Sequence, residues 1–129
     1  MRVVPSKHAG WRENGGQGDV YWLAEGAQAG YTHPHVVIQE DALNHSRVTS
    51  VVVCALTSNM ARAKAPGNVL LDPGEANLSR RSIVVVSQVA SVEKSRLGEY
   101  IGTLSQQRIE QILAGMRFLE RIAARPERE

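Results

Sequence analysis

The sequence has a single cysteine, a single phenylalanine and no long apolar run. Cys54 has no second cysteine to pair with, which excludes an internal disulfide and a zinc site built from cysteine pairs. The longest uninterrupted apolar run is Val51–Leu56, far shorter than the roughly 20 residues of a membrane-spanning helix. Residues 1–16 also lack the apolar stretch of a secretory signal peptide. We therefore expect a cytoplasmic protein that does not cross a membrane, with Cys54 as an inert buried thiol.

Most sequence motifs of enzyme active sites are missing as well. The chain has no glycine-rich phosphate loop, nucleophile elbow, cysteine pair or helical pair of histidines. Its net charge is only +2, but positions 44–96 carry seven basic and three acidic residues. Such a local surplus can attract a phosphate backbone, and it can equally be the solvated surface of loops.

What is present is the composition of one packed domain, with 129 residues of which 43% are hydrophobic and 22% charged. Apolar runs bounded by turn residues predict five strands. These cover Asp19–Ala24, His33–Gln39, Thr49–Leu56, Asn68–Leu71 and Ser82–Val89. The third run is apolar almost throughout and is predicted to be central. Proline within a sheet is confined to edge strands or to the first residues of a strand. Pro34 therefore predicts either that the second strand lies at an edge of the sheet or that Pro34 stands at the start of that strand.

The C-terminal segment changes to a helical period. Its apolar positions, spaced as one helix face, are Ile109, Ile112, Leu113, Met116 and Leu119. Ser105 is the expected N-cap, the helix is expected to run to about Arg125, and Phe118 points away from the main apolar face. Residues 1–17 lack any period and are expected to form a flexible tail, so the domain spans 18–125. The predicted fold is mainly β, a small curled antiparallel sheet or barrel with a C-terminal α-helix.

Polar side chains gather at the ends of the apolar strands, where scaffolds often present functional groups. These are His33 and His35, Thr57 and Ser58, and Ser87 and Gln88. The two histidines lie on one face of a regular strand, and a metal site there would need Glu40 or His45 as further ligands. Threonine and serine after a strand more often bond backbone groups of a turn, so catalysis and turn formation both remain open for Thr57 and Ser58.

Six segments in chain order resemble the MazF/PemK family. They are GDVYW (18–22), HPHVVIQED (33–41) with Asn44, VVVCALTS (51–58), PGNVLL (66–71), SIVVVSQV (82–89) and VEKSRLGEYIGTLS (92–105). The resemblance covers about residues 17–122 and implies a small SH3-like, plug-type β-barrel. It also implies a homodimeric toxin of a toxin-antitoxin pair that cleaves single-stranded messenger RNA without a metal or other cofactor. A cognate antitoxin protein would neutralise it, and operator DNA would be bound only by the toxin-antitoxin complex.

The resemblance also implies roles for single residues. In RNA cleavage without a metal, the ribose 2′-hydroxyl attacks phosphorus and leaves a 2′,3′-cyclic phosphate, which needs a base, an acid and charge stabilisation. His33 stands where the family typically has a catalytic arginine. Thr57 matches the catalytic threonine or serine, with Ser58 assisting. Because imidazole as a side-chain type loses its charge near neutral pH and guanidinium does not, we expect a stronger pH dependence than in relatives with arginine.

We expect RNA to be held through its phosphates by Arg62 and Lys64, the basic residues of the loop between Thr57 and Pro66. Gln88, which is kept from the family pattern, and Asn44 are the further expected RNA contacts. Besides His33, three further positions depart from the family pattern. Val85, Ser87 and Ala90 stand where members place an arginine, an aspartate and an arginine. These departures favour an alternative, a relative that has lost cleavage and binds only an antitoxin or nucleic acid. A homodimer is expected from the family, from Phe118 and from an edge strand led by Pro34.

Overall fold

The computed structural model describes residues 10–24 and 32–124. Six strands, two α-helices and three short 3-10 helices follow one another in the described chain. They are β1 (Asp19–Ala24), β2 (Thr32–Val37), α1 (Asp41–Asn44), β3 (Ser50–Thr57), η1 (Met60–Lys64), β4 (Val69–Leu71), η2 (Glu75–Asn77), β5 (Ser82–Glu93), η3 (Lys94–Arg96), β6 (Leu97–Thr103) and α2 (Gln106–Ala123). Among the described residues, no helix is both long and apolar enough to cross a membrane.

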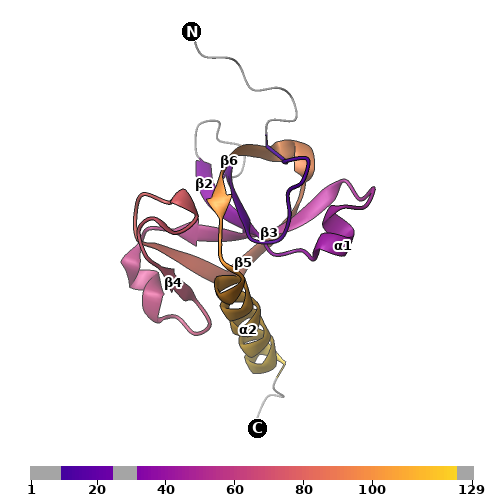
Figure 1. The fold of residues 1–129 in the computed structure, drawn as a ribbon. Coiled ribbons are helices and arrows are strands. Elements are labelled where there is room, and N and C mark those ends of the chain that lie inside the picture. The colour runs from indigo at the N-terminus through magenta and orange to yellow at the C-terminus, as the bar shows by residue number, and fades with distance from the viewer. Residues whose placement is uncertain (1–9, 25–31, 125–129) are drawn as a thin grey trace.

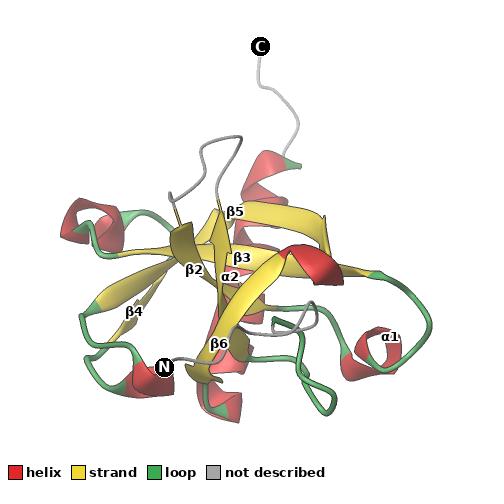
Figure 2. Cartoon of the chain, turned by 90° about the horizontal axis from the view of Figure 1, so that it is seen from above, coloured by secondary structure: helices red, strands yellow, loops and turns green. Residues whose placement is uncertain are grey.

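The six strands form one antiparallel sheet in the order β4-β5-β3-β2-β1-β6. The sheet curls into a half-barrel, seen from two directions in Figures 1 and 2. Contact between η2 and β6 closes the curl, because Asn77 Nδ2 donates to the Ile101 carbonyl oxygen at 3.0 Å. A Cβ at Gly102 would lie 2.2 Å from the Ala76 carbonyl oxygen, so this approach needs glycine. The predicted fold class is confirmed.

Both faces of the sheet carry buried apolar side chains. One face packs with α2 through residues that include Val20, Val36, Leu56, Val84 and Ile112. The opposite face forms a second cluster around Tyr21, Val37, Val51, Val53 and Leu97. Strand β3 contributes alternate residues to the two clusters and is paired on both sides, as predicted for a central strand.

Cys54 is fully buried in β3, and its Sγ donates to the Val85 carbonyl oxygen at 3.0 Å. Burial raises the pKa of this thiol to about 12. The thiolate is the reactive form of cysteine, and a thiol with this pKa stays protonated at neutral pH. The sequence-based interpretation of Cys54 as an inert core residue is therefore confirmed.

Strand β2 lies inside the sheet, which corrects the expectation of an edge strand led by Pro34. Pro34 is the third residue of β2 and stands opposite Trp22 of β1. Pairing of β2 with β3 begins only at His35. Pro34 thus lies in the opening stretch of β2 that has no β3 partner, and its missing N–H removes no hydrogen bond of that ladder.

Two strands differ from the sequence-based prediction. Strand β5 runs on to Glu93 instead of ending at Val89, and β6 was not predicted. The sequence of β6, LGEYIGT, contains two glycines and few apolar residues, so its strand signal is weak. Its pairing with β1 also shifts register twice, as expected for a strand that bends to follow a curled sheet.

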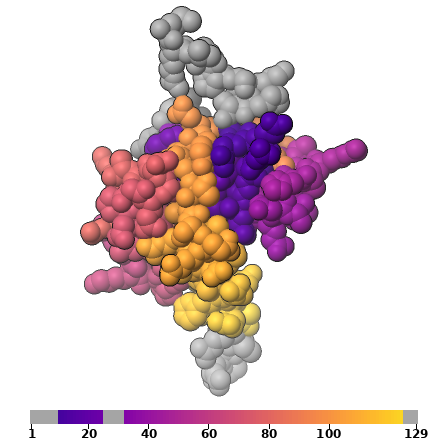
Figure 3. Space-filling model, viewed as in Figure 1, coloured from indigo at the N-terminus to yellow at the C-terminus, as the bar shows by residue number. Residues whose placement is uncertain are grey.

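Helix α2 begins as predicted, with Ser105 Oγ accepting from the Arg108 N–H at 3.2 Å. It ends at Ala123, and the predicted end near Arg125 lies outside the described residues. Ile109 and Ile112 are buried against the sheet, whereas Phe118 is 42% exposed, as its position on the helix predicted. The last turns of α2 extend beyond the body of the sheet in Figures 1 and 3.

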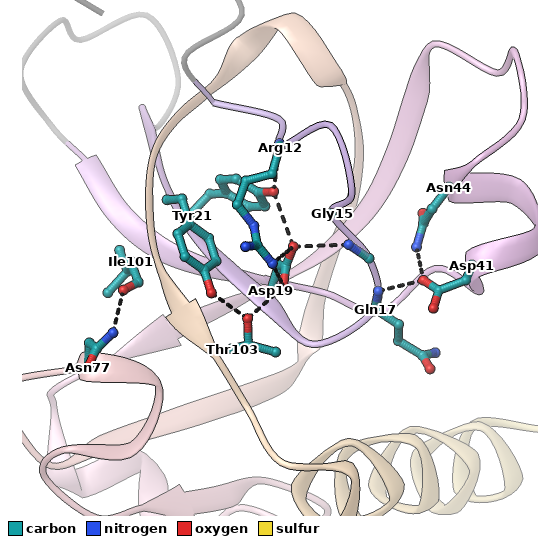
Figure 4. A network of polar contacts seen from close by, with 12 residues as sticks. Arg12, Gly15, Gln17, Asp19, Tyr21, Asp41, Asn44, Asn77, Ile101 and Thr103 are labelled. Carbon is teal, nitrogen blue, oxygen red and sulfur yellow. Dashed lines mark hydrogen bonds and ion pairs between the residues drawn. The ribbon is translucent and has the colours of Figure 1, made fainter.

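Residues 10–17, assigned from the sequence to a flexible tail, pack against the sheet. The Trp11 ring stacks on Tyr21 with centroids 6.0 Å apart. Arg12 forms a salt bridge of 3.2 Å with Asp19, which is buried and also accepts from the Thr103 hydroxyl at 2.7 Å (Figure 4). This buried carboxylate therefore ties the segment before β1 to both β1 and β6.

Candidate functional site

A cavity of about 400 Å³ opens where the end of β3, the start of β2 and the segment between η2 and β5 meet. Antiparallel pairing explains this meeting, because Thr57 at the end of β3 stands opposite Ile83 at the start of β5. Residues just after β3 therefore lie beside residues just before β5. The walls mix apolar side chains such as Leu56, Leu78 and Ile101 with polar ones.

The three predicted catalytic residues all line this cavity. His33 and Thr57 are half-buried, and Ser58 is exposed. Thr57 Oγ1 accepts a hydrogen bond from the Asn59 N–H at 3.1 Å, which fixes the hydroxyl in the turn after β3. A hydroxyl that accepts one bond can still donate its own proton. Thr57 can therefore both stabilise the turn and take part in catalysis, since the hydrogen bond from the backbone orients its hydroxyl.

Two further lining residues were missed from the sequence, Arg80 and Trp22. Arg80 supplies an exposed guanidinium, and its carbonyl oxygen accepts from the buried Ser82 hydroxyl at 3.0 Å. Trp22 is 38% exposed and presents an aromatic surface. The signal for Arg80 was its place before a strand that pairs with the strand ending at Thr57, which becomes readable only when the pairing is known.

The four predicted RNA contacts do not line the cavity. Arg62 and Lys64 lie on η1, the 3-10 helix that follows Ser58 within a few residues. Gln88 is exposed near the middle of β5. Asn44 is only 2% exposed and serves the fold of α1, because its amide donates to the Gln39 carbonyl oxygen at 2.7 Å and accepts from the Gln39 side chain.

Two of the histidines, His35 and His45, have main-chain partners. His35 is buried with its Nδ1 at 2.9 Å from the His33 carbonyl oxygen, and His45 Nε2 lies 2.8 Å from the Gly15 carbonyl oxygen. Within residues 10–24 and 32–124, no group of three His, Cys, Asp or Glu side chains is placed to hold a metal ion. The cavity itself offers the imidazole of His33, the hydroxyls of Thr57 and Ser58, and Arg80.

The fold and cavity define a small half-barrel β protein with a polar pocket built from strand ends. Residues 16–119 match the model of the PemK-like, MazF-like toxins of type II toxin-antitoxin systems. The chain is 32% identical over 103 residues to Endoribonuclease MazF6 of Mycobacterium tuberculosis, covering 77% of this chain and 90% of that one. It is 30% identical over 100 residues to Endoribonuclease MazF of Staphylococcus saprophyticus, covering 74% of this chain and 82% of that one.

Solved structures show the same fold. A mycobacterial endoribonuclease in complex with its cognate antitoxin superposes with a TM-score of 0.68 at 20% identity, covering 88% of this chain and 99% of that one. A MazE-MazF structure from Deinococcus radiodurans gives a TM-score of 0.63 at 22% identity, covering 82% of this chain and 94% of that one. The chain belongs to the PemK-like, MazF-like toxin family of type II toxin-antitoxin systems.

Proposed function

We propose that this protein is a toxin that cuts single-stranded messenger RNA endonucleolytically, without a metal, and leaves a 2′,3′-cyclic phosphate and a 5′-hydroxyl. The observation that carries the proposal is the convergence on one cavity of His33, from β2, with Thr57 and Ser58, at and just after the end of β3. The relatives at 30% identity or more are named endoribonucleases, which supports the same activity.

The groups in the cavity suit this reaction. As the 2′-oxygen forms its bond to phosphorus and the bond to the 5′-oxygen breaks, one proton leaves the 2′-hydroxyl and one reaches the departing 5′-oxygen. His33 exchanges one of these protons, because imidazole both accepts and donates near neutral pH, and solvent water exchanges the other. Thr57 and Ser58 donate hydrogen bonds to the non-bridging phosphate oxygens. Trp22 provides a face on which an unpaired base can stack, which favours single-stranded RNA.

We further propose the partners that the family implies. A cognate antitoxin protein neutralises the toxin, and one of the solved structures of this fold is itself an endoribonuclease bound to its cognate antitoxin. The antitoxin is expected to be a short acidic chain that becomes ordered on binding. The toxin is expected to be a homodimer, and operator DNA is expected to bind only the toxin-antitoxin complex.

The test is cleavage of a long single-stranded RNA in EDTA by the purified protein, with the new ends mapped. His33→Ala and Thr57→Ala are the informative variants, and Ser91→Ala, an exposed hydroxyl on β5 outside the cavity, is the matched control. We expect cutting at a short recurrent sequence by the parent and the control, and loss in the other two. Cutting that persists in His33→Ala at the parental rate would remove His33 from the mechanism.

A second candidate function is binding without cleavage. The absence of charged side chains at three positions of β5 favours this function. Val85 is 1% exposed and belongs to the core, so this position presents no charge to a substrate. Ser87 and Ala90 are exposed there but carry no ionisable group. Expression of the chain without an antitoxin separates the two functions. Growth arrest that is lost in Thr57→Ala supports cleavage, whereas normal growth with stable expression supports a binding module.

A further inference from the structure

The proposed reaction needs a fixed positive charge. Negative charge builds up on the non-bridging oxygens while the 2′-oxygen adds to phosphorus, and a cation aimed at them lowers the barrier. A guanidinium keeps its charge at every physiological pH, whereas an imidazole does not. With histidine at position 33, the cavity has to draw its permanent cation from elsewhere in the chain.

Among the described residues that line the cavity, Arg80 is the one arginine or lysine. Arg62 and Lys64 lie outside the lining, on η1. Two other arginines of the described chain form ion pairs with carboxylates away from the cavity. Arg12 pairs with Asp19, and Arg108 binds both oxygens of Glu75 at 2.9 and 2.8 Å. No ion pair of Arg80 occurs within the described residues.

The backbone at Arg80 is held in place from the core. Ser82, the first residue of β5, is 6% exposed, and its hydroxyl donates to the Arg80 carbonyl oxygen at 3.0 Å. The next residue, Ile83, pairs with Thr57 of β3 and with Leu70 of β4. The backbone of Arg80 is thus anchored beside the end of β3, while the residue remains exposed.

We propose that Arg80 is the guanidinium that holds the scissile phosphate, facing the hydroxyls of Thr57 and Ser58 across the cavity. This inference rests on the proposed nuclease function and names the residue that supplies its charge. The two hydroxyls and the planar guanidinium together offer donors to the non-bridging oxygens, and the guanidinium can bind two of them in parallel.

The experiment compares Arg80→Ala and Arg80→Lys with Arg81→Ala, which removes the neighbouring exposed arginine outside the lining. Single-turnover cleavage of single-stranded RNA in EDTA is measured first, and circular dichroism confirms folding. We expect Arg80→Ala to slow cleavage about 100-fold, as for loss of one transition-state donor. Arg80→Lys should recover part of the rate, since charge is kept and the fork is lost. Arg81→Ala should stay within about threefold of the parent.

Binding of a 2′-O-methyl RNA of random sequence, which lacks the attacking hydroxyl, is measured beside cleavage. Loss of one phosphate contact should lower the slope of log K against log salt by about 0.7 in Arg80→Ala and leave it unchanged in Arg80→Lys. If the parent does not cut RNA but this slope change appears, the nuclease function fails and the phosphate contact stands. The inference would be overturned if Arg80→Ala cleaved RNA at the parental rate and kept the parental slope of log K against log salt.

Discussion

Thr57 shows how one side chain can serve the fold and the chemistry together. Its oxygen accepts from the Asn59 N–H at 3.1 Å, which orients the hydroxyl at the cavity wall. Serine offers the same oxygen, so Thr57→Ser should keep both the turn and most of the cleavage rate. Thr57→Ala should lose about 100-fold in single-turnover cleavage, as for removal of one hydrogen-bond donor to an oxyanion. Rates within twofold of the parent for Thr57→Ala would exclude the hydroxyl from the reaction.

Tyr21 gives a prediction on stability against pH. Burial raises its pKa to about 12, with the nearby Asp19 charge acting in the same direction. A group with a raised folded-state pKa contributes stability that is complete below its unfolded pKa near 10 and is lost as the pH rises from about 10 toward 12. The urea midpoint of the parent should therefore fall steeply above pH 10.

The control for this effect is Tyr21→Phe, which keeps the ring against Trp11 and Tyr100 and removes the ionisable hydroxyl. It also removes the bond from the Tyr21 hydroxyl to Asp19 at 3.3 Å, so its stability at neutral pH should be lower by about 1 kcal/mol. Its urea midpoint should fall less steeply than that of the parent above pH 10. Identical slopes in the two proteins would show that Tyr21 does not govern the alkaline transition.

At the scale of elements, the contact between α2 and the turn before β4 depends on two glycines. A Cβ at Gly115 of α2 would lie 2.1 Å from the Gly67 carbonyl oxygen, and Gly67 itself has a φ of +82°. Helix propensity alone predicts that Gly115→Ala stabilises by about 1 kcal/mol. The clash instead requires the helix and this turn to move apart, so we expect a net destabilisation of about 1–3 kcal/mol.

Urea unfolding measures this effect, and Ala114→Gly is the matched control at an exposed position of the same helix. The control should lose about 1 kcal/mol through helix propensity alone. The two substitutions thus exchange the same residue types in opposite directions, and both are expected to destabilise. A Gly115→Ala protein as stable as the parent, or more so, would mean that the helix and turn are less tightly packed than the contact indicates.

The elements that the sequence predicted well are those whose signal is local. The apolar run of β3 and the helical period and Ser105 cap of α2 are complete within their own segments. Strand β6 was missed because its stability comes from pairing with β1 and from η2, which no window of its own sequence contains. The ordering of residues 10–17 was missed for the same reason, since it depends on Trp11 meeting Tyr21.

The residues of the candidate site also differ in whether their signal is local in the sequence. His33, Thr57 and Ser58 were identified because the resemblance places them within short motifs, and the structure brings all three to one cavity. Arg80 and Trp22 were missed because only the three-dimensional pairing of β3 with β5 and of β1 with β2 takes them there. Asn44 lies in a family-like segment, but its burial assigns it to the support of α1.

At the scale of the whole molecule, an apolar strip lies exposed on β4 and α2 among the described residues. Leu70 of β4 and Phe118 of α2 are each 42% exposed and border the same groove, and Ile122, one turn further along α2, is 45% exposed. The C-terminal end of α2 extends past the rest of the described domain in Figure 3. Side chains of this size on adjoining surfaces are typical of a protein interface, and a second copy would bury both strips at once.

We therefore expect the purified protein to be a dimer at micromolar concentration by light scattering, and Phe118→Glu to shift it to monomer without unfolding it. A charge buried in a symmetric interface appears twice and repels itself, in addition to the lost apolar contact. Leu43→Glu, at a leucine of α1 that is 50% exposed and outside that groove, is the matched control and should remain dimeric. A monomeric parent would remove the basis for a symmetric toxin. A dimer that persists in Phe118→Glu and breaks in Leu43→Glu would move the interface to the α1 side of the half-barrel.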